Sequence, residues 1–113
     1  MDLADRPCVP CGKGTPPLEE ESCRELLTGL DPGWELDAAG RLVRELSFPD
    51  FAGALAYVNR VGEIAEEADH HPEIELGWGR VRLRIWTHSI DGLSENDFIL
   101  AARCDRAVWA IEW

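Results

Sequence analysis

Residues 80–88 constrain the fold more strongly than any other part of the chain. Their sequence, RVRLRIWTH, alternates without a break between two kinds of side chain. One set is apolar or small (Val81, Leu83, Ile85 and Thr87), and the other carries a charge or a ring (Arg80, Arg82, Arg84, Trp86 and His88). Because successive side chains of a strand point to opposite faces of a sheet, this pattern predicts a half-buried β-strand. A sheet with one buried and one open face is typical of antiparallel proteins.

Helical and strand-like segments surround this strand. The patterns predict helices within 18–30, 47–68 and 94–113, a hairpin of two strands within 34–48, and a short strand at 74–78. The order of elements is therefore α-β-β-α-β-β-α. Since the connections are short, neighbouring strands should be antiparallel, and we expect an α+β fold whose helices cover one face of the sheet.

The two longer helices carry start signals and apolar stripes. Pro49 suits a helix entry, and either Ser47 or Asp50 can cap the second helix. Ser94 can cap the third helix, with Asp97 three residues later as a carboxylate variant of the capping box. The predicted buried stripes are Phe51, Leu55, Val58, Gly62 and Ala65 on the second helix, and Ala101, Cys104, Val108 and Ile111 on the third.

Residues 1–17 differ in character from the rest. Proline and glycine recur too often in MDLADRPCVPCGKGTPP for a regular helix or strand, so we expect an irregular arm ahead of a domain at 18–113. Cys8 and Cys11 have the C-x-x-C spacing of half a zinc site or of a redox pair. The chain has no second C-x-x-C and no H-x-H. A mobile arm with inert thiols is therefore favoured, while metal capture between subunits and redox sensitivity stay open.

Charge and hydropathy exclude some classes of function. The net charge is −11, whereas nucleic-acid binding needs a basic surface, so no nucleic-acid partner is expected. No apolar run reaches the length of a membrane span, and the first residues lack a hydrophobic signal segment. We therefore expect a cytoplasmic protein with no membrane partner, whose cysteines stay reduced.

All three histidines lie close together in the second half of the chain. His70 and His71 are adjacent, a spacing that disfavours a metal site and leaves zinc as a lesser alternative. Nothing resembles a nucleophile elbow, so nucleophilic catalysis is not expected. Proton transfer fits better, because histidine titrates near neutral pH and Pro72 restrains His71 to extended backbone. If the strands are neighbours, His88 can meet the pair in one pocket, which Asp97 can close.

Each of these residues also has a purely structural interpretation. Asp97 can serve only as a helix cap, and His88 can be an ordinary surface residue. Trp78 and Trp86 can be core or interface aromatics. The alternating arginines can simply form a solvated or oligomeric face.

The spacing around the histidines resembles that of a known family. Glu66-x-x-x-His70-His71-Pro72, five residues, Trp78, nine residues, His88, eight residues and Asp97 is similar to the signature of the pterin-4a-carbinolamine dehydratases. Further positions that resemble the family are Trp34 after DPG, Phe48-x-x-Phe51, THS and GLSENDF. The resemblance covers residues 18–113 and leaves the C-x-x-C arm outside it.

The resemblance implies a four-stranded antiparallel sheet with three helices packed on one face, in a homodimer or homotetramer. It implies dehydration of 4a-hydroxytetrahydropterin to quinonoid dihydropterin by histidine acid–base catalysis, with no metal and no cofactor. This reaction recycles the pterin of aromatic amino-acid hydroxylases, so a hydroxylase is an implied partner. Asp97 would orient His88 or contact the pterin. The implied catalytic residues are His70, His71 and His88, and the implied substrate-binding residues are Glu66, Asp97, Trp34 and Pro72.

The family also implies an alternative function. An animal member acts as a dimerisation cofactor of a homeodomain transcription factor, and a branch without the histidines assembles RuBisCO. The alternative is therefore a non-catalytic interaction, coactivator or assembly module of the same fold. The three histidines of this chain argue against the assembly branch, because a scaffold has no use for them.

Overall fold

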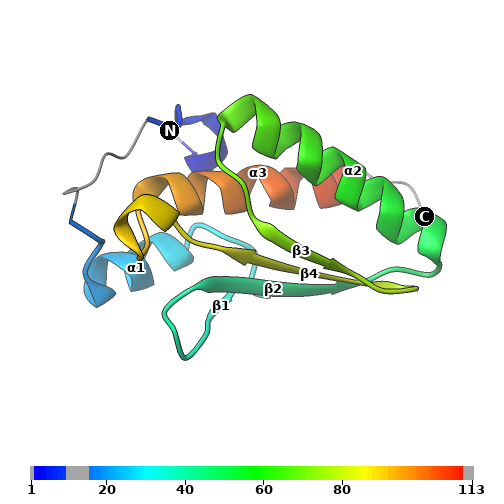
Figure 1. The fold of residues 1–113 in the computed structure, drawn as a ribbon, viewed down its shortest axis with the longest axis horizontal. Coiled ribbons are helices and arrows are strands. Elements are labelled where there is room, and N and C mark those ends of the chain that lie inside the picture. Colours follow the sequence, from blue (N-terminus) through cyan, green and yellow to red (C-terminus); the bar gives the residue numbers. More distant parts are fainter. Residues whose placement is uncertain (1, 10–15, 111–113) are drawn as a thin grey trace.

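The structure, a computed structural model, describes residues 2–9 and 16–110. It has the predicted α+β class and order of elements, with two added 3₁₀ turns (Figure 1). The helices are α1 (Glu20–Leu27), α2 (Phe51–Ala68) and α3 (Glu95–Ala110). The strands are β1 (Glu35–Leu36), β2 (Leu42–Ser47), β3 (Glu73–Leu76) and β4 (Arg80–Ile85). The 3₁₀ turns are η1 (Leu3–Asp5) and η2 (His88–Ile90).

The four strands form one antiparallel sheet in the order β1-β2-β4-β3. Leu42 lies opposite Ile85 and Leu46 opposite Val81, so the apolar side chains of β2 and β4 share one face. The long helices α2 and α3 lie across this face (Figure 1), and Val81, Leu83 and Ile85 are fully buried. The alternation of residues 80–88 therefore predicted the buried side of the strand correctly.

The buried face of α2 differs from the predicted one. Of the predicted residues Phe51, Leu55, Val58, Gly62 and Ala65, Ala65 is buried as expected, and Val58 and Gly62 are half-buried. The buried residues of α2 are Ala54, Tyr57, Val61, Ile64 and Ala65. Phe51 and Leu55 are 43% and 38% exposed. Ala54, Tyr57, Val61 and Ile64 recur at steps of three and four, as the predicted set does, so helical spacing alone cannot decide which of the two faces meets the sheet. Tyr57 fixes the choice, because its ring packs on Phe48 and its hydroxyl donates to the Cys104 carbonyl (3.2 Å).

Helix α3 is buried around most of its circumference. Its predicted stripe is confirmed at Ala101 and Cys104, which are fully buried, while Val108 is half-buried and Ile111 lies outside the described residues. The adjoining Phe98, Ile99, Leu100 and Ala102 are buried as well. The extra burial arises because η1 of the N-terminal arm also packs on α3.

The N-terminal arm is not wholly irregular. Residues 3–5 form η1, and Leu3 is buried in the same core as the sheet and the helices. Cys8 is half-buried. Cys11 lies outside the described residues, so the alternatives for the C-x-x-C pair stay open.

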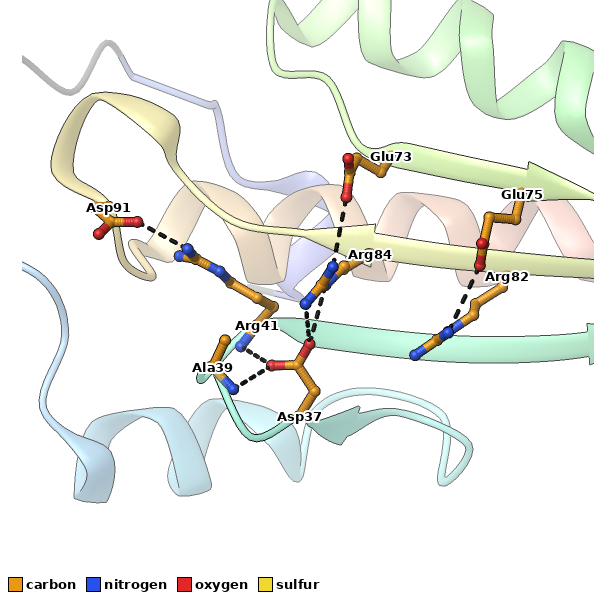
Figure 2. A network of polar contacts seen from close by, with 8 residues as sticks. All are labelled: Asp37, Ala39, Arg41, Glu73, Glu75, Arg82, Arg84 and Asp91. Atoms are coloured by element: carbon orange, nitrogen blue, oxygen red, sulfur yellow. Dashed lines mark hydrogen bonds and ion pairs between the residues drawn. The ribbon is translucent and has the colours of Figure 1, made fainter.

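The open face of the sheet places arginines beside carboxylates (Figure 2). Arg82 lies opposite Glu75 in the register, and its guanidinium is 3.6 Å from a Glu75 oxygen. Arg84 lies 2.9 Å from an Asp37 oxygen and 3.8 Å from a Glu73 oxygen. Cross-strand pairs of opposite charge stabilise a sheet by about 0.2–1 kcal/mol each. The alternating arginines therefore help to hold the strands together.

Candidate active site

A pocket of about 490 Å³ lies where the end of α2, the end of β4 and the start of α3 meet. All three histidines line it, since His70 and His71 follow α2 and His88 begins η2. The other walls come from Ala68, Asp69, Trp86, Thr87, Ser89 and Asn96, together with Cys8 and Val9 of the N-terminal arm. The structure thus brings residues from four segments of the chain to one place.

The end of α2 fixes the position of His70. Asp69 adopts the left-handed conformation (φ 50°, ψ 42°), which reverses the chain after the helix. The backbone N–H of His70 then donates to the Ala65 carbonyl (3.1 Å), the outer hydrogen bond of a Schellman motif. Pro72 restrains His71 to extended backbone. Because both sides of the pair are restrained, the two histidines leave the helix in fixed directions.

Asp97 holds His70 from the protein interior. Its carboxylate is fully buried, and Oδ1 lies 2.5 Å from Nε2 of His70. Oδ2 accepts the backbone N–H of Ser94 (2.8 Å) and the hydroxyl of Thr87 (2.8 Å). The Ser94 bond is the cap predicted for α3, so one side chain caps the helix and fixes a histidine ring. Its partner is His70 and not His88, the partner suggested by the family resemblance.

His71 has a different partner from His70. Its Nε2 pairs with a carboxylate oxygen of Glu66, which precedes it on the last turns of α2. Both side chains of this pair are exposed, whereas the His70 ring is mostly buried. Water screens an exposed pair, so Glu66 holds His71 less firmly than Asp97 holds His70.

His88 stacks on Trp86. The two ring centroids are 4.3 Å apart and the planes differ by 5°. The Arg41 guanidinium lies 4.7 Å from the centroid of the Trp86 ring, and that of Arg84 lies 5.8 Å from it, both within cation–π range. Arg41 and Arg84 also belong to the charged network of the sheet and its hairpin (Figure 2). The network therefore reaches the pocket wall through Trp86.

None of the four residues expected to bind substrate lines the pocket: Glu66, Asp97, Trp34 and Pro72. Glu66 and Asp97 pair with His71 and His70, which do line it. Trp34 is buried, and its indole N–H donates to the Asp105 carboxylate (2.8 Å). Asp105 also accepts the backbone N–H of Asp31 (3.0 Å) and pairs with Arg44. Burial raises the pKa of the Asp105 carboxyl, although these donors pull the other way. Trp34 thus belongs to a buried network that joins the hairpin to α3.

The described cysteines of the core do not supply a nucleophile. Burial raises the pKa of the Cys104 thiol to about 12 and also raises the pKa of the Cys23 thiol. Since the thiolate is the reactive form, neither side chain is a nucleophile near neutral pH. Over residues 2–9 and 16–110, no three His, Cys, Asp or Glu side chains gather where they could hold a metal ion. In the same part of the chain, no helix combines the length and apolar content needed to cross a membrane.

Comparison with known proteins identifies the family. The family model "Pterin 4 alpha carbinolamine dehydratase" matches residues 16–107, which include the three histidines and Asp97. The chain belongs to the pterin-4a-carbinolamine dehydratase family. The matched segment begins after residues 8 and 9 of the pocket wall.

Curated relatives in the dehydratase family match nearly the whole chain. A protein of Rubrobacter xylanophilus named "Putative pterin-4-alpha-carbinolamine dehydratase" is 50% identical over 105 residues, covering 93% of this chain and 97% of its own length. A protein of Halorhodospira halophila with the same name is 48% identical over 106 residues, covering 93% and 96%.

Solved structures share the dehydratase-family fold. The crystal structure of a transcriptional coactivator/pterin dehydratase from Brucella melitensis has a TM-score of 0.77 at 32% identity, covering 81% of this chain and 98% of that one. A pterin dehydratase-like protein described as a RuBisCO assembly factor in the α-carboxysome has a TM-score of 0.58 at 22% identity, covering 67% and 89%, and shares the fold alone. The predicted family and the predicted α+β fold are confirmed.

Sequence reasoning missed several residues of this dehydratase-family pocket. Thr87 and Asn96 lie in the THS and GLSENDF segments, so the family signature contained a signal for both. Trp86 has only the signal of a large ring two residues before His88 on the same strand face. Cys8 and Val9 carry no such signal, because no periodic pattern predicts where a proline-rich arm packs.

Proposed function

We propose that this chain removes water from 4a-hydroxytetrahydropterin and forms quinonoid dihydropterin. The C4a hydroxyl is protonated and leaves as water, while N5 loses its proton as the C4a–N5 double bond forms. The observation that carries the proposal is one pocket lined by three histidines, one of them backed by a fully buried carboxylate. Its size fits a small bicyclic molecule, since pockets for such ligands span about 300–1,000 Å³.

His70 is the histidine best suited to accept the N5 proton. Its Nε2 faces Asp97, so the second ring nitrogen is the one that can take a proton from a ligand. The buried carboxylate then stabilises the imidazolium that forms. His71 and His88 are more exposed, and either can protonate the leaving hydroxyl and recover its proton from water. A positioned acid or base contributes about 10²–10⁴-fold to such a step, which needs no metal or cofactor.

The proposal extends to the role of the protein in the cell. We place it in the cytoplasm as a homodimer or homotetramer that recycles the pterin of an aromatic amino-acid hydroxylase. Large exposed apolar side chains support an oligomer, because interface cores are rich in such residues: Phe51, Leu55, Trp78 and Trp109. Light scattering that gives the mass of one chain at micromolar concentration would contradict the oligomer.

A direct assay tests the activity. The 4a-carbinolamine is generated in a stopped-flow cell, and its decay is followed by absorbance with the wild type, with His70→Ala/His88→Ala, and with Arg80→Ala as control. We expect the wild type to accelerate the decay. The acceleration by the double variant should be at least about 100-fold smaller than that by the wild type. Arg80 is exposed on the open face of the sheet, where it pairs with Glu45, so the control should keep full activity.

The same assay separates the enzyme from the alternative function. If the wild type and the double variant leave the decay unchanged, and both capture the same protein partner, the chain is a non-catalytic interaction or assembly module. If the wild type accelerates the decay and the double variant does not, the histidines are catalytic and the chain is an enzyme.

A further inference from the structure

The N-terminal arm is fastened along α3 by a series of hydrogen bonds. Arg103 donates to the backbone carbonyls of Ala4 (3.2 Å) and Arg6 (2.7 Å). Arg106 contacts both carboxylate oxygens of Asp5, at 2.8 and 3.1 Å. Figure 1 shows this part of the arm lying beside α3, near the end of α2. The path of the arm toward the pocket is therefore fixed by the folded domain.

Asn96 then holds residue 9 at the pocket. The backbone N–H of Val9 donates to Oδ1 of Asn96 (2.9 Å), and Nδ2 of Asn96 donates back to the Val9 carbonyl. Asn96 is itself buried and lies next to Asp97 on the first turn of α3. The same helical turn therefore positions two parts of the pocket: the His70 ring through Asp97, and residue 9 of the arm through Asn96.

Val9 presents an apolar side chain at the pocket. It is among the lining residues, and it is 59% exposed, which leaves much of its surface available to a ligand. The match to the family model begins at residue 16, so this wall lies outside the segment that the family model matches. A wall built from such a segment can adapt the pocket to one substrate without altering the histidines.

The chemistry of a pterin decides which of its edges can face Val9. The pyrimidine edge carries nitrogen and oxygen atoms that lose hydrogen bonds with water when they meet an apolar group, which is unfavourable. The edge formed by C6 and C7 carries carbon–hydrogen groups, which gain from contact with a methyl group, and it also carries the ring substituent, whose size a wall at this edge would limit. We infer that Val9, held by Asn96, is a specificity-determining wall for the C6 substituent of the pterin. This inference rests on the proposed function.

The test compares two 4a-hydroxytetrahydropterins, one with a methyl group at C6 and one with a dihydroxypropyl group. The wild type, Val9→Phe, Asn96→Ala and the control Arg80→Ala are assayed for kcat and KM with each. The bulkier Val9→Phe should lower kcat/KM for the dihydroxypropyl substrate by about tenfold relative to the methyl substrate. Asn96→Ala releases the wall, so KM should rise about fivefold while kcat stays within twofold, as expected for contacts made equally in the ground and transition states.

The outcomes are separable. If the wild type turns over neither substrate, the proposed function fails and the inference fails with it. If the wild type is active but Val9→Phe leaves the ratio of the two kcat/KM values within twofold of the wild-type ratio, only the inference is overturned. Val9 is exposed, so its substitution tests the wall even if thermal unfolding shows that Asn96→Ala destabilises the fold. A fall in kcat without a change in KM for Asn96→Ala would assign Asn96 to the histidine site and would also overturn the inference.

Discussion

Replacing Asp97 with Asn separates its two roles, because the amide can keep one of them and must lose the other. The amide oxygen can take the place of Oδ2, which accepts the Ser94 N–H and the Thr87 hydroxyl at 2.8 Å each. The amide nitrogen then faces Nε2 of His70 as a donor, where a carboxylate oxygen now lies at 2.5 Å. His70 would have to present Nε2 as an acceptor and carry its proton on Nδ1, which removes the proton-accepting nitrogen from the pocket.

The size of the effect follows from these contacts. Loss of one positioned base costs about 10²–10⁴-fold in kcat, which corresponds to about 3–5 kcal/mol of transition-state stabilisation. The free energy of unfolding should fall by only about 1 kcal/mol, since both buried donors keep an acceptor. Asp97→Ala removes that acceptor, and a buried unsatisfied N–H on Ser94 costs about 1–3 kcal/mol. The Thr87 hydroxyl keeps a partner in Ser94 Oγ at 2.7 Å.

Two measurements check this prediction. Stopped-flow decay of the 4a-carbinolamine gives kcat for the wild type, Asp97→Asn and Asp97→Ala, and urea unfolding gives their stabilities. We expect Asp97→Asn to be nearly as stable as the wild type but strongly impaired in kcat. If Asp97→Asn is folded and keeps kcat within about threefold of the wild type, Asp97 is only a helix cap and the proposed role of His70 is refuted.

Other side chains give predictions that do not depend on Asp97. Trp86→Ala removes the ring on which His88 stacks, and kcat should fall about fivefold, with recovery in Trp86→Phe; equal activity of all three proteins would show that the stack has no effect on catalysis. Asp105→Ala removes the more deeply buried of the two carboxylates that pair with Arg44, and it also removes the acceptor of the Trp34 indole, while Asp31 stays 3.1 Å from Arg44. Urea unfolding should therefore show a loss of about 3–5 kcal/mol, and a loss below about 1 kcal/mol would contradict a structural role. With a pKa of about 12, the Cys104 thiol should resist alkylation at pH 8 in the native protein and react once urea unfolds it. Labelling of native Cys104 at the rate of an exposed thiol would refute its burial.

The parts of the fold that depend on local patterns could be predicted from the sequence. Alternation along residues 80–88 identified the buried side of β4, because the period of a strand assigns every side chain to one face. The hairpin predicted within 34–48 is present, and Gly40 between its strands adopts φ +76°, which favours glycine. The cap between Ser94 and Asp97 was likewise predicted and is present. In each case, residues close in sequence determine the outcome.

The parts that depend on long-range packing could not be predicted. Two apolar stripes on α2 have the same spacing, and only the contacts of Tyr57 decide which is buried. Trp34 matches a family position, yet its indole binds Asp105 on α3, a pairing across 71 positions of sequence that no local pattern encodes. Val9 was not predicted as a pocket residue for the same reason, because Asn96 at the start of α3 sets its position.

The decay of 4a-hydroxytetrahydropterin with and without the wild-type protein decides whether the chain is a dehydratase. The claim is that the pocket of His70, His71 and His88 dehydrates this compound. We expect the first-order rate of decay to rise with protein concentration, to saturate with substrate, and to exceed the spontaneous rate at least about tenfold at micromolar protein. A decay that stays at the spontaneous rate, with a folded protein confirmed by circular dichroism, would contradict it.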